Sequence, residues 1–172
     1  MYRIYCFRKL AVTVEGVDFL DPAQAGQPDV RERGVRLELR GLSESAEAGS
    51  VYASRAAWLS RGICRFDLLE SRPNAADRMH WHPEMSDGEP GDRVFDAELS
   101  ADPVGWLART LGDITPLLHR AGLDPAEHDA DIAAMARSAD EITATVAKVL
   151  TAARQPWPEV TRDERGLAPI DV

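Results

Sequence analysis

Two histidines and a glutamate alternate along residues 78–85, which read Arg-Met-His-Trp-His-Pro-Glu-Met. In an extended strand alternate side chains point to the same face, so His80, His82 and Glu84 are predicted to share one face with Arg78. Side chains two positions apart on that face are about 6.5–7 Å apart, which lets two imidazoles converge on one ion. Imidazole and carboxylate groups are ligands of divalent metals and also acid–base groups. We therefore predict His80, His82 and Glu84 as candidate metal ligands, with a divalent metal ion as the candidate cofactor.

A working metal site needs a third and often a fourth ligand. Asp67, Asp96 or His119 could supply one from elsewhere in the chain, and Pro83 could bend the strand and turn Glu84 away from the histidines. Two other interpretations stay open. The face could bind a ligand or move protons without a metal, or it could be a polar strand face that is only solvated.

The His-x-His spacing of His80 and His82 resembles the pair with which cupins hold a metal inside a β-barrel. The resemblance covers only these residues, because no later strand motif supplies another histidine and the C-terminal third is predicted to be helical. The chain is therefore not assigned to that family.

Arginines near the histidines suggest a site for a small anionic ligand. Arg55, Arg65 and Arg78 carry guanidinium groups, whose planar fork suits a carboxylate or a phosphate. Asp67 is predicted to lie opposite Arg55 across a hairpin and is counted with the ligand-binding residues. The alternative is that Arg55 and Asp67 form a cross-strand ion pair on a solvated face.

Composition limits the class of protein. The 172 residues carry a formal net charge of −9, an acidic balance that excludes broad binding to nucleic acid or to anionic membranes. No window approaches the about 18 uncharged apolar residues of a membrane-spanning helix, and the N-terminus lacks the apolar core of a signal peptide. Cys6 and Cys64 have neither CxxC spacing nor a disulfide-rich context. The sequence therefore predicts a soluble cytoplasmic protein with no nucleic-acid or membrane partner.

The first hundred residues are predicted to form an antiparallel β-sheet of about five to seven strands, arranged like a meander. The predicted strands are residues 2–14, 35–40, 51–59, 63–70, 78–85 and 93–99. Ser60-Arg61-Gly62 is predicted to connect two of them, because a glycine suits the positive φ of a hairpin turn. Alternation predicts a shared core of Trp58, Phe66, Trp81 and Phe95, with the charged side chains on the opposite face.

Residues 101–154 are predicted to form a helical hairpin of the same domain, followed by an irregular, proline-containing tail over 155–172. Asp102-Pro103 is typical of a helix start, whereas Gly112 and Pro116 predict a break in the first helix. The separation of strands from helices along the chain predicts an α+β fold, an antiparallel sheet followed by a C-terminal α-helical hairpin.

Apolar residues recur along the second predicted helix at spacings of three and four. They are Ile132, Met135, Ala139, Ile142, Val146, Val149 and Ala153. Such a seam packs either on its own domain or on a second copy of the chain. We expect a homodimer, and a non-enzymatic interaction or structural module is the alternative to a metal-binding or ligand-binding function. The sequence identifies no reaction, so whether the protein is an enzyme stays open.

Overall fold

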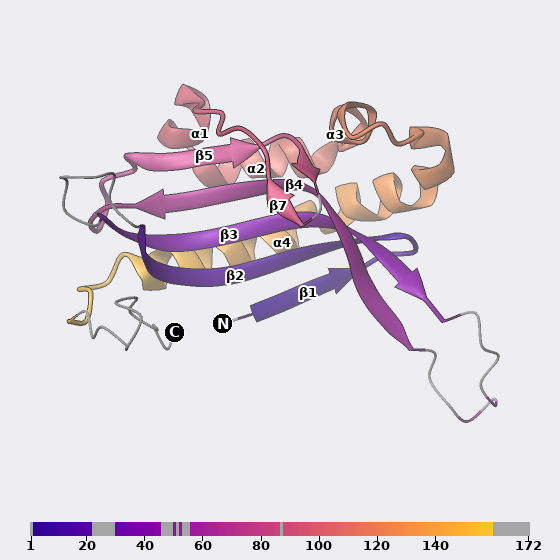
Figure 1. The fold of residues 1–172 in the computed structure, drawn as a ribbon, viewed down its shortest axis with the longest axis horizontal. Coiled ribbons are helices and arrows are strands. Elements are labelled where there is room, and N and C mark those ends of the chain that lie inside the picture. The colour runs from indigo at the N-terminus through magenta and orange to yellow at the C-terminus, as the bar shows by residue number, and fades with distance from the viewer. Residues whose placement is uncertain are drawn as a thin grey trace.

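The computed structural model describes residues 2–21, 30–45, 50, 52, 56–86 and 88–159. Five antiparallel strands form one sheet in chain order (Figure 1): β1 (Tyr2–Cys6), β2 (Leu10–Asp21), β3 (Val30–Glu44), β4 (Ala57–Glu70) and β5 (Arg78–His82). Two short strands, β6 (Met85–Ser86) and β7 (Glu89–Pro90), form a second, small sheet. The predicted antiparallel meander is confirmed.

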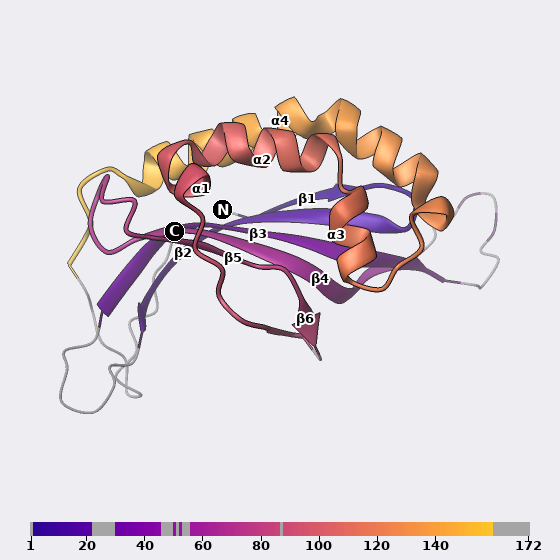
Figure 2. The ribbon, with the colours of Figure 1, turned by 90° about the horizontal axis from the view of Figure 1, so that it is seen from above.

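The helical part consists of α1 (Ala97–Ala101), α2 (Pro103–Gly112), α3 (Thr115–Arg120), the 3₁₀ turn η1 (Pro125–His128) and the long helix α4 (Asp129–Ala153). Figure 2 shows α2 and α4 side by side over one face of the sheet. The fold is α+β, as predicted, but a two-helix hairpin is not confirmed, because α3 and η1 separate α2 from the one long helix. None of the helices in the described ranges is long and apolar enough to cross a membrane.

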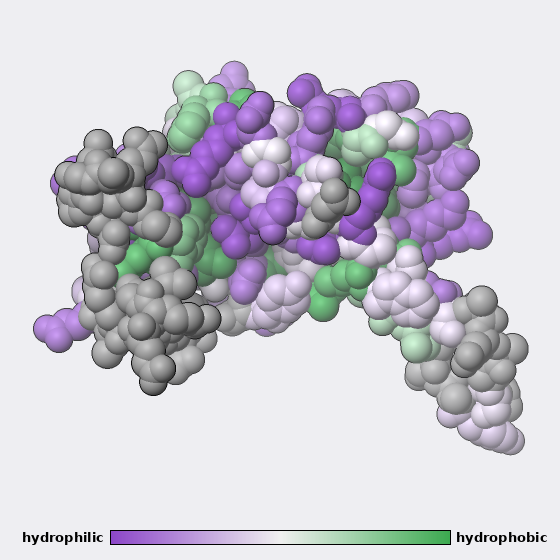
Figure 3. Space-filling model, in the orientation of Figure 1, coloured by the Kyte–Doolittle hydropathy of each residue, from purple (hydrophilic) through white to green (hydrophobic). Residues whose placement is uncertain are grey.

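Alternation along the strands gives the sheet an apolar face and a polar face. One cross-strand row consists of Val14, Leu37, Phe66 and Trp81, and it packs with the helices in the hydrophobic core. The neighbouring row on the other face consists of Glu15, Arg36, Asp67 and His80, and the next row there of Thr13, Glu38, Arg65 and His82. Figure 3 views this polar face, away from α4, and shows mainly hydrophilic residues over its centre.

The apolar seam of α4 packs against the sheet of its own chain. Met135, Ala139, Ile142, Val146 and Val149 are all buried in the core that α4 forms with α2 and the strands. The seam therefore needs no second copy of the chain to cover it.

The predicted strand over residues 2–14 is in fact two strands. The chain turns at Phe7-Arg8-Lys9, a segment without glycine or proline. One carboxylate oxygen of Asp131, in the first turn of α4, accepts hydrogen bonds from the backbone N–H groups of Arg8, Lys9 and Leu10 at 2.8, 2.8 and 3.1 Å. A residue more than a hundred positions away therefore holds this turn.

The predicted hairpin at Ser60-Arg61-Gly62 is wrong, because β4 runs through this segment with an irregular register against β3. The side chain of Met85 packs against Gly62, since an added Cβ would lie 2.5 Å from the sulfur of Met85 and would displace the end of that side chain. The connection between β3 and β4 begins after Glu44, and residues 46–49, 51 and 53–55 lie outside the described residues. In Figure 1 the paired ends of β3 and β4 extend beyond the body of the sheet.

Residues 93–99 do not form the predicted strand. Val94 makes an isolated bridge to Trp81, and the Asp96 side chain then caps α1 by accepting from the backbone N–H groups of Glu98 and Leu99. Phe95 is 66% exposed and Trp58 is 52% exposed, so neither joins the predicted aromatic core. Phe66 and Trp81 do meet there, with ring centroids 5.8 Å apart.

Replacing Asp131 with alanine should destabilise the protein strongly. The variant leaves three backbone N–H groups without their acceptor, and such losses at charged, buried acceptors together cost about 2–4 kcal/mol. Asp129→Ala, an exposed position in the same helical turn, is the matched control and should change the free energy of unfolding little. Urea titrations of both variants measure the difference, and equal stabilities would contradict the role given to Asp131.

Candidate metal centre

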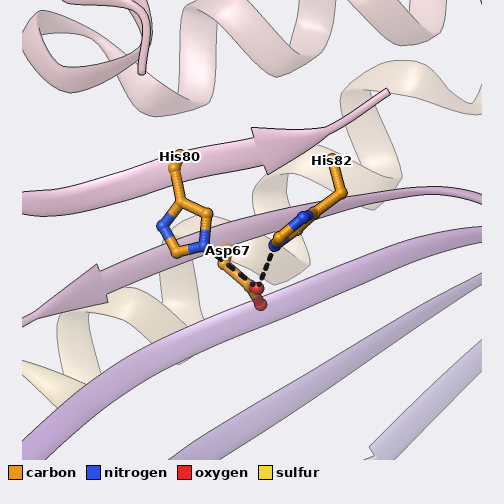
Figure 4. A group of neighbouring side chains, drawn as sticks. All are labelled: Asp67, His80 and His82. Carbon is orange, nitrogen blue, oxygen red and sulfur yellow. Dashed lines mark ion pairs between the residues drawn. The ribbon is translucent and has the colours of Figure 1, made fainter. Parts of the chain in front are cut away.

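Three titratable side chains converge on the polar face of the sheet. Asp67 comes from β4, and His80 and His82 come from β5, whose register places His80 directly opposite Asp67. Each offers one ligand atom, and these three atoms lie within 4.8 Å of one another (Figure 4). All three residues are at most 3% exposed. Any charge at this point is therefore shielded from water and depends on its neighbours.

Backbone carbonyl groups determine how the two imidazoles face the carboxylate. His80 Nδ1 lies 2.7 Å from the carbonyl oxygen of Arg78, and His82 Nδ1 lies 2.7 Å from that of Gly91. A carbonyl oxygen only accepts hydrogen bonds, so each Nδ1 carries the proton and donates it. In the neutral ring, Nε2 then presents its lone pair. Both Nε2 atoms face Asp67 Oδ2, at 3.6 and 3.5 Å (Figure 4).

Two lone pairs and a carboxylate oxygen that face one another repel unless a cation lies between them. The cation can be a proton on an imidazole or a metal ion. Burial lowers the pKa of His80 below its ordinary value, which favours the neutral ring. A proton on His80 is therefore disfavoured at this point, which leaves a proton on His82 or a metal ion as the cation.

Asp67 is held as an ionised carboxylate. Burial by itself raises a carboxyl pKa, but a hydrogen bond from His82, which needs a proton on Nε2, and the charges of Arg36 and Arg65 outweigh burial and hold the pKa of Asp67 well below its usual range. Arg36 Nε donates to Oδ1 at 2.8 Å, and Arg65 Nε forms an ion pair with Oδ2 at 3.1 Å. Oδ1 is thus anchored, while Oδ2 is the oxygen that both histidines face.

Residues from the stretches 83–86 and 88–96 help to cover the site. This part of the chain leaves β5 at His82 and carries β6, which lies on the side of the sheet away from α2 and α4 (Figure 2). The segment returns through Gly91, whose carbonyl oxygen accepts from His82, and through Phe95, whose ring centroid is 5.5 Å from that of His80. This segment therefore orients His82 and packs against His80.

The structure brings His80 and His82 together with Asp67 and not with Glu84. Strand β5 ends at His82, before Pro83, so the alternation does not continue to Glu84, whose side chain is exposed. Asp67 is one of the three supplementary ligands named from the sequence. Asp96, another of them, caps α1 and accepts from Trp106 Nε1.

The predicted arginines occupy different places. Arg65 contacts Asp67, whereas Arg78 lies 4.0 Å from Glu32 Oε1 and supplies the carbonyl group that orients His80. Arg55 lies outside the described residues. Sequence reasoning missed Arg36, the residue that anchors Asp67. The sequence pattern that could have indicated Arg36 is the alternation of charged residues over 31–40. This pattern places Arg36 on a polar strand face but does not show which residue it contacts.

The triad of Asp67, His80 and His82 has the ligand set of an open metal site. Two imidazole nitrogens and one carboxylate oxygen occur in catalytic zinc sites and in non-haem iron sites. Ligand atoms bound about 2.0–2.1 Å from a tetrahedral zinc ion are about 3.4 Å apart, close to the 3.5 and 3.6 Å found here. No protein-family model, curated protein sequence or solved structure matches the chain, so function is inferred from this geometry.

A second carboxylate is buried on the same sheet face. Glu32 on β3 is 0% exposed, and within the described part of the chain neither of its carboxylate oxygens has a hydrogen-bond partner. Burial, and then the charge of Asp21, raise the pKa of Glu32, while Arg93 and Arg78 oppose this. Its ionised form is therefore costly in the folded protein.

Glu32→Gln should stabilise the protein at pH 7 and not at pH 4. Above the ordinary carboxyl pKa of 4.5, the unfolded chain releases the Glu32 proton more readily than the folded one. Between this pKa and the higher pKa of Glu32 in the folded protein, the folded state binds more protons than the unfolded state. Glu32 therefore lowers the free energy of unfolding as pH rises through this range. Urea unfolding at the two pH values measures this.

Glu38→Gln is the matched control on the same strand, because Glu38 is paired with Arg40 and its loss should destabilise the protein at pH 7. A Glu32→Gln variant that is less stable than wild type at pH 7, but not at pH 4, would show that ionised Glu32 is favourable and contradict this account.

Proposed function

We propose that this protein binds one divalent metal ion of the zinc or non-haem iron class through His80 Nε2, His82 Nε2 and Asp67 Oδ2. The observation that supports this most is the pair of hydrogen bonds from Nδ1 to backbone carbonyl oxygens. Metal-binding histidines usually donate their other ring N–H in this way, which fixes the tautomer and the orientation of the ring.

The number of ligands favours a site that acts on a ligand over a purely structural one. Structural zinc sites are closed by four protein ligands, whereas catalytic sites have three and keep a position for water or substrate. The described residues supply three. A metal bound there would lower the pKa of a coordinated water to about 7 or polarise a coordinated oxygen. Asp67 would supply the negative charge and the two histidines neutral donors.

The alternative is a non-enzymatic homodimeric interaction module, which was predicted from the apolar seam of α4. Burial of that seam within one chain removes the reason for a partner there. Sedimentation velocity at micromolar concentration tests the alternative without reference to metal. A stable dimer in protein that binds no divalent ion would favour the module.

Isothermal titration of tag-free protein with Zn²⁺ tests the metal proposal. We expect one ion per chain, with affinity reduced more than about 100-fold in His80→Ala and in His82→Ala, since removing a ligand costs more than removing its orienting partner. His119→Ala is the control, because His119 lies in the last turn of α3, away from the triad. Wild type that binds no Zn²⁺, or ligand variants that bind it as tightly as wild type, would reject the proposal.

A further inference from the structure

The charges around the triad do not balance a bare divalent ion. Asp67 carries one negative charge and contacts two guanidinium groups, those of Arg36 and Arg65. The nearest further carboxylate in contact with Arg65 is Glu38, at 3.8 Å, and Glu38 is also paired with Arg40. Among these five side chains the three arginines outnumber the two carboxylates, so a divalent cation would add to a net positive charge, which is costly without an additional anion.

An unused hydrogen-bond donor lies beside the proposed metal position. Arg65 Nε is 3.1 Å from Asp67 Oδ2, the oxygen that both histidines face. This nitrogen is nevertheless buried and makes no hydrogen bond to any described residue. Arg40 Nε, on the other side of Glu38, is likewise buried and without an acceptor among the residues described. Buried N–H donors of this kind are normally satisfied.

We propose that the metal ion binds together with a small oxyanion, a carboxylate or a phosphate, which takes the open coordination position and accepts a hydrogen bond from Arg65 Nε. The proposal rests on the proposed metal site. The bound anion would supply both the missing negative charge and a hydrogen-bond acceptor for Arg65 Nε. A guanidinium group is suited to both carboxylate and phosphate oxygens. The anion is small, because Asp67, His80 and His82 are at most 3% exposed.

Cobalt(II) provides the test, because its visible absorption reports the coordination of the bound ion. Co²⁺ is titrated into tag-free protein at constant ionic strength in sodium perchlorate, and then with sodium acetate or inorganic phosphate added at equal free Co²⁺. We expect one or both anions to change the Co²⁺ spectrum and to tighten Co²⁺ binding by about tenfold or more, a typical coupling between linked ligands. The anion that acts identifies a carboxylate or a phosphate as the ligand.

In Arg65→Gln the Co²⁺ affinity and spectrum should no longer respond to the anion, and Arg65→Lys, which keeps the charge but lacks Nε, should lose most of the response. Arg61→Gln, an exposed arginine on the same strand, is the matched control and should behave like wild type.

Wild-type protein that binds Co²⁺ with the same affinity and spectrum in all three solutions would overturn the anion proposal and leave the metal site standing. A full anion effect in Arg65→Gln would also overturn it. Wild type that binds no Co²⁺ in any solution would overturn the proposed function itself. The wild-type comparison needs no substitution, so a variant that fails to fold does not affect it.

Discussion

A single buried carboxylate organises the polar half of this molecule. Asp67 is an ionised group taken out of water, and such a group is tolerated only where opposite charges and hydrogen-bond donors surround it. Arg36 comes from β3, Arg65 from β4 itself, and His80 and His82 from β5. A slip of one residue between any two of these strands would turn some of these side chains to the helical face. The buried carboxylate of Asp67 would then lose the groups that stabilise its charge. The need to surround Asp67 with these groups therefore fixes the register of the three strands.

Alternation in the sequence was enough to place both histidines on one face, because a period of two is a property of the strand itself. The prediction failed at Glu84, because β5 ends at His82, before Pro83. The direction of the Glu84 side chain is therefore no longer set by the strand. The partner of Asp67 was not predictable in the same way. Arg36 reaches it across a pairing of β3 with β4 whose register the sequence does not state.

The errors in the fold have the same physical origin. Gly62 suggested a turn, yet it lies within β4, where the side chain of Met85 approaches it from a later segment. The turn at residues 7–9 gave no local signal, because the carboxylate of Asp131 satisfies its backbone N–H groups. Local patterns predicted the α+β class and the two faces of the sheet, whereas features set by contacts between distant segments could not be read from short windows.

Long-range ¹H–¹⁵N correlation NMR of the histidine rings in Zn²⁺-loaded protein tests the central claim most directly, because it reports the state of each ring nitrogen. The hydrogen bonds to the carbonyl oxygens of Arg78 and Gly91 require a proton on Nδ1 of His80 and His82. The account predicts that both rings are neutral, with Nδ1 protonated and the ¹⁵N resonance of Nε2 shifted by the metal. Spectra that show Nε2 protonated in either ring, or Nε2 resonances that Zn²⁺ does not change, would contradict it.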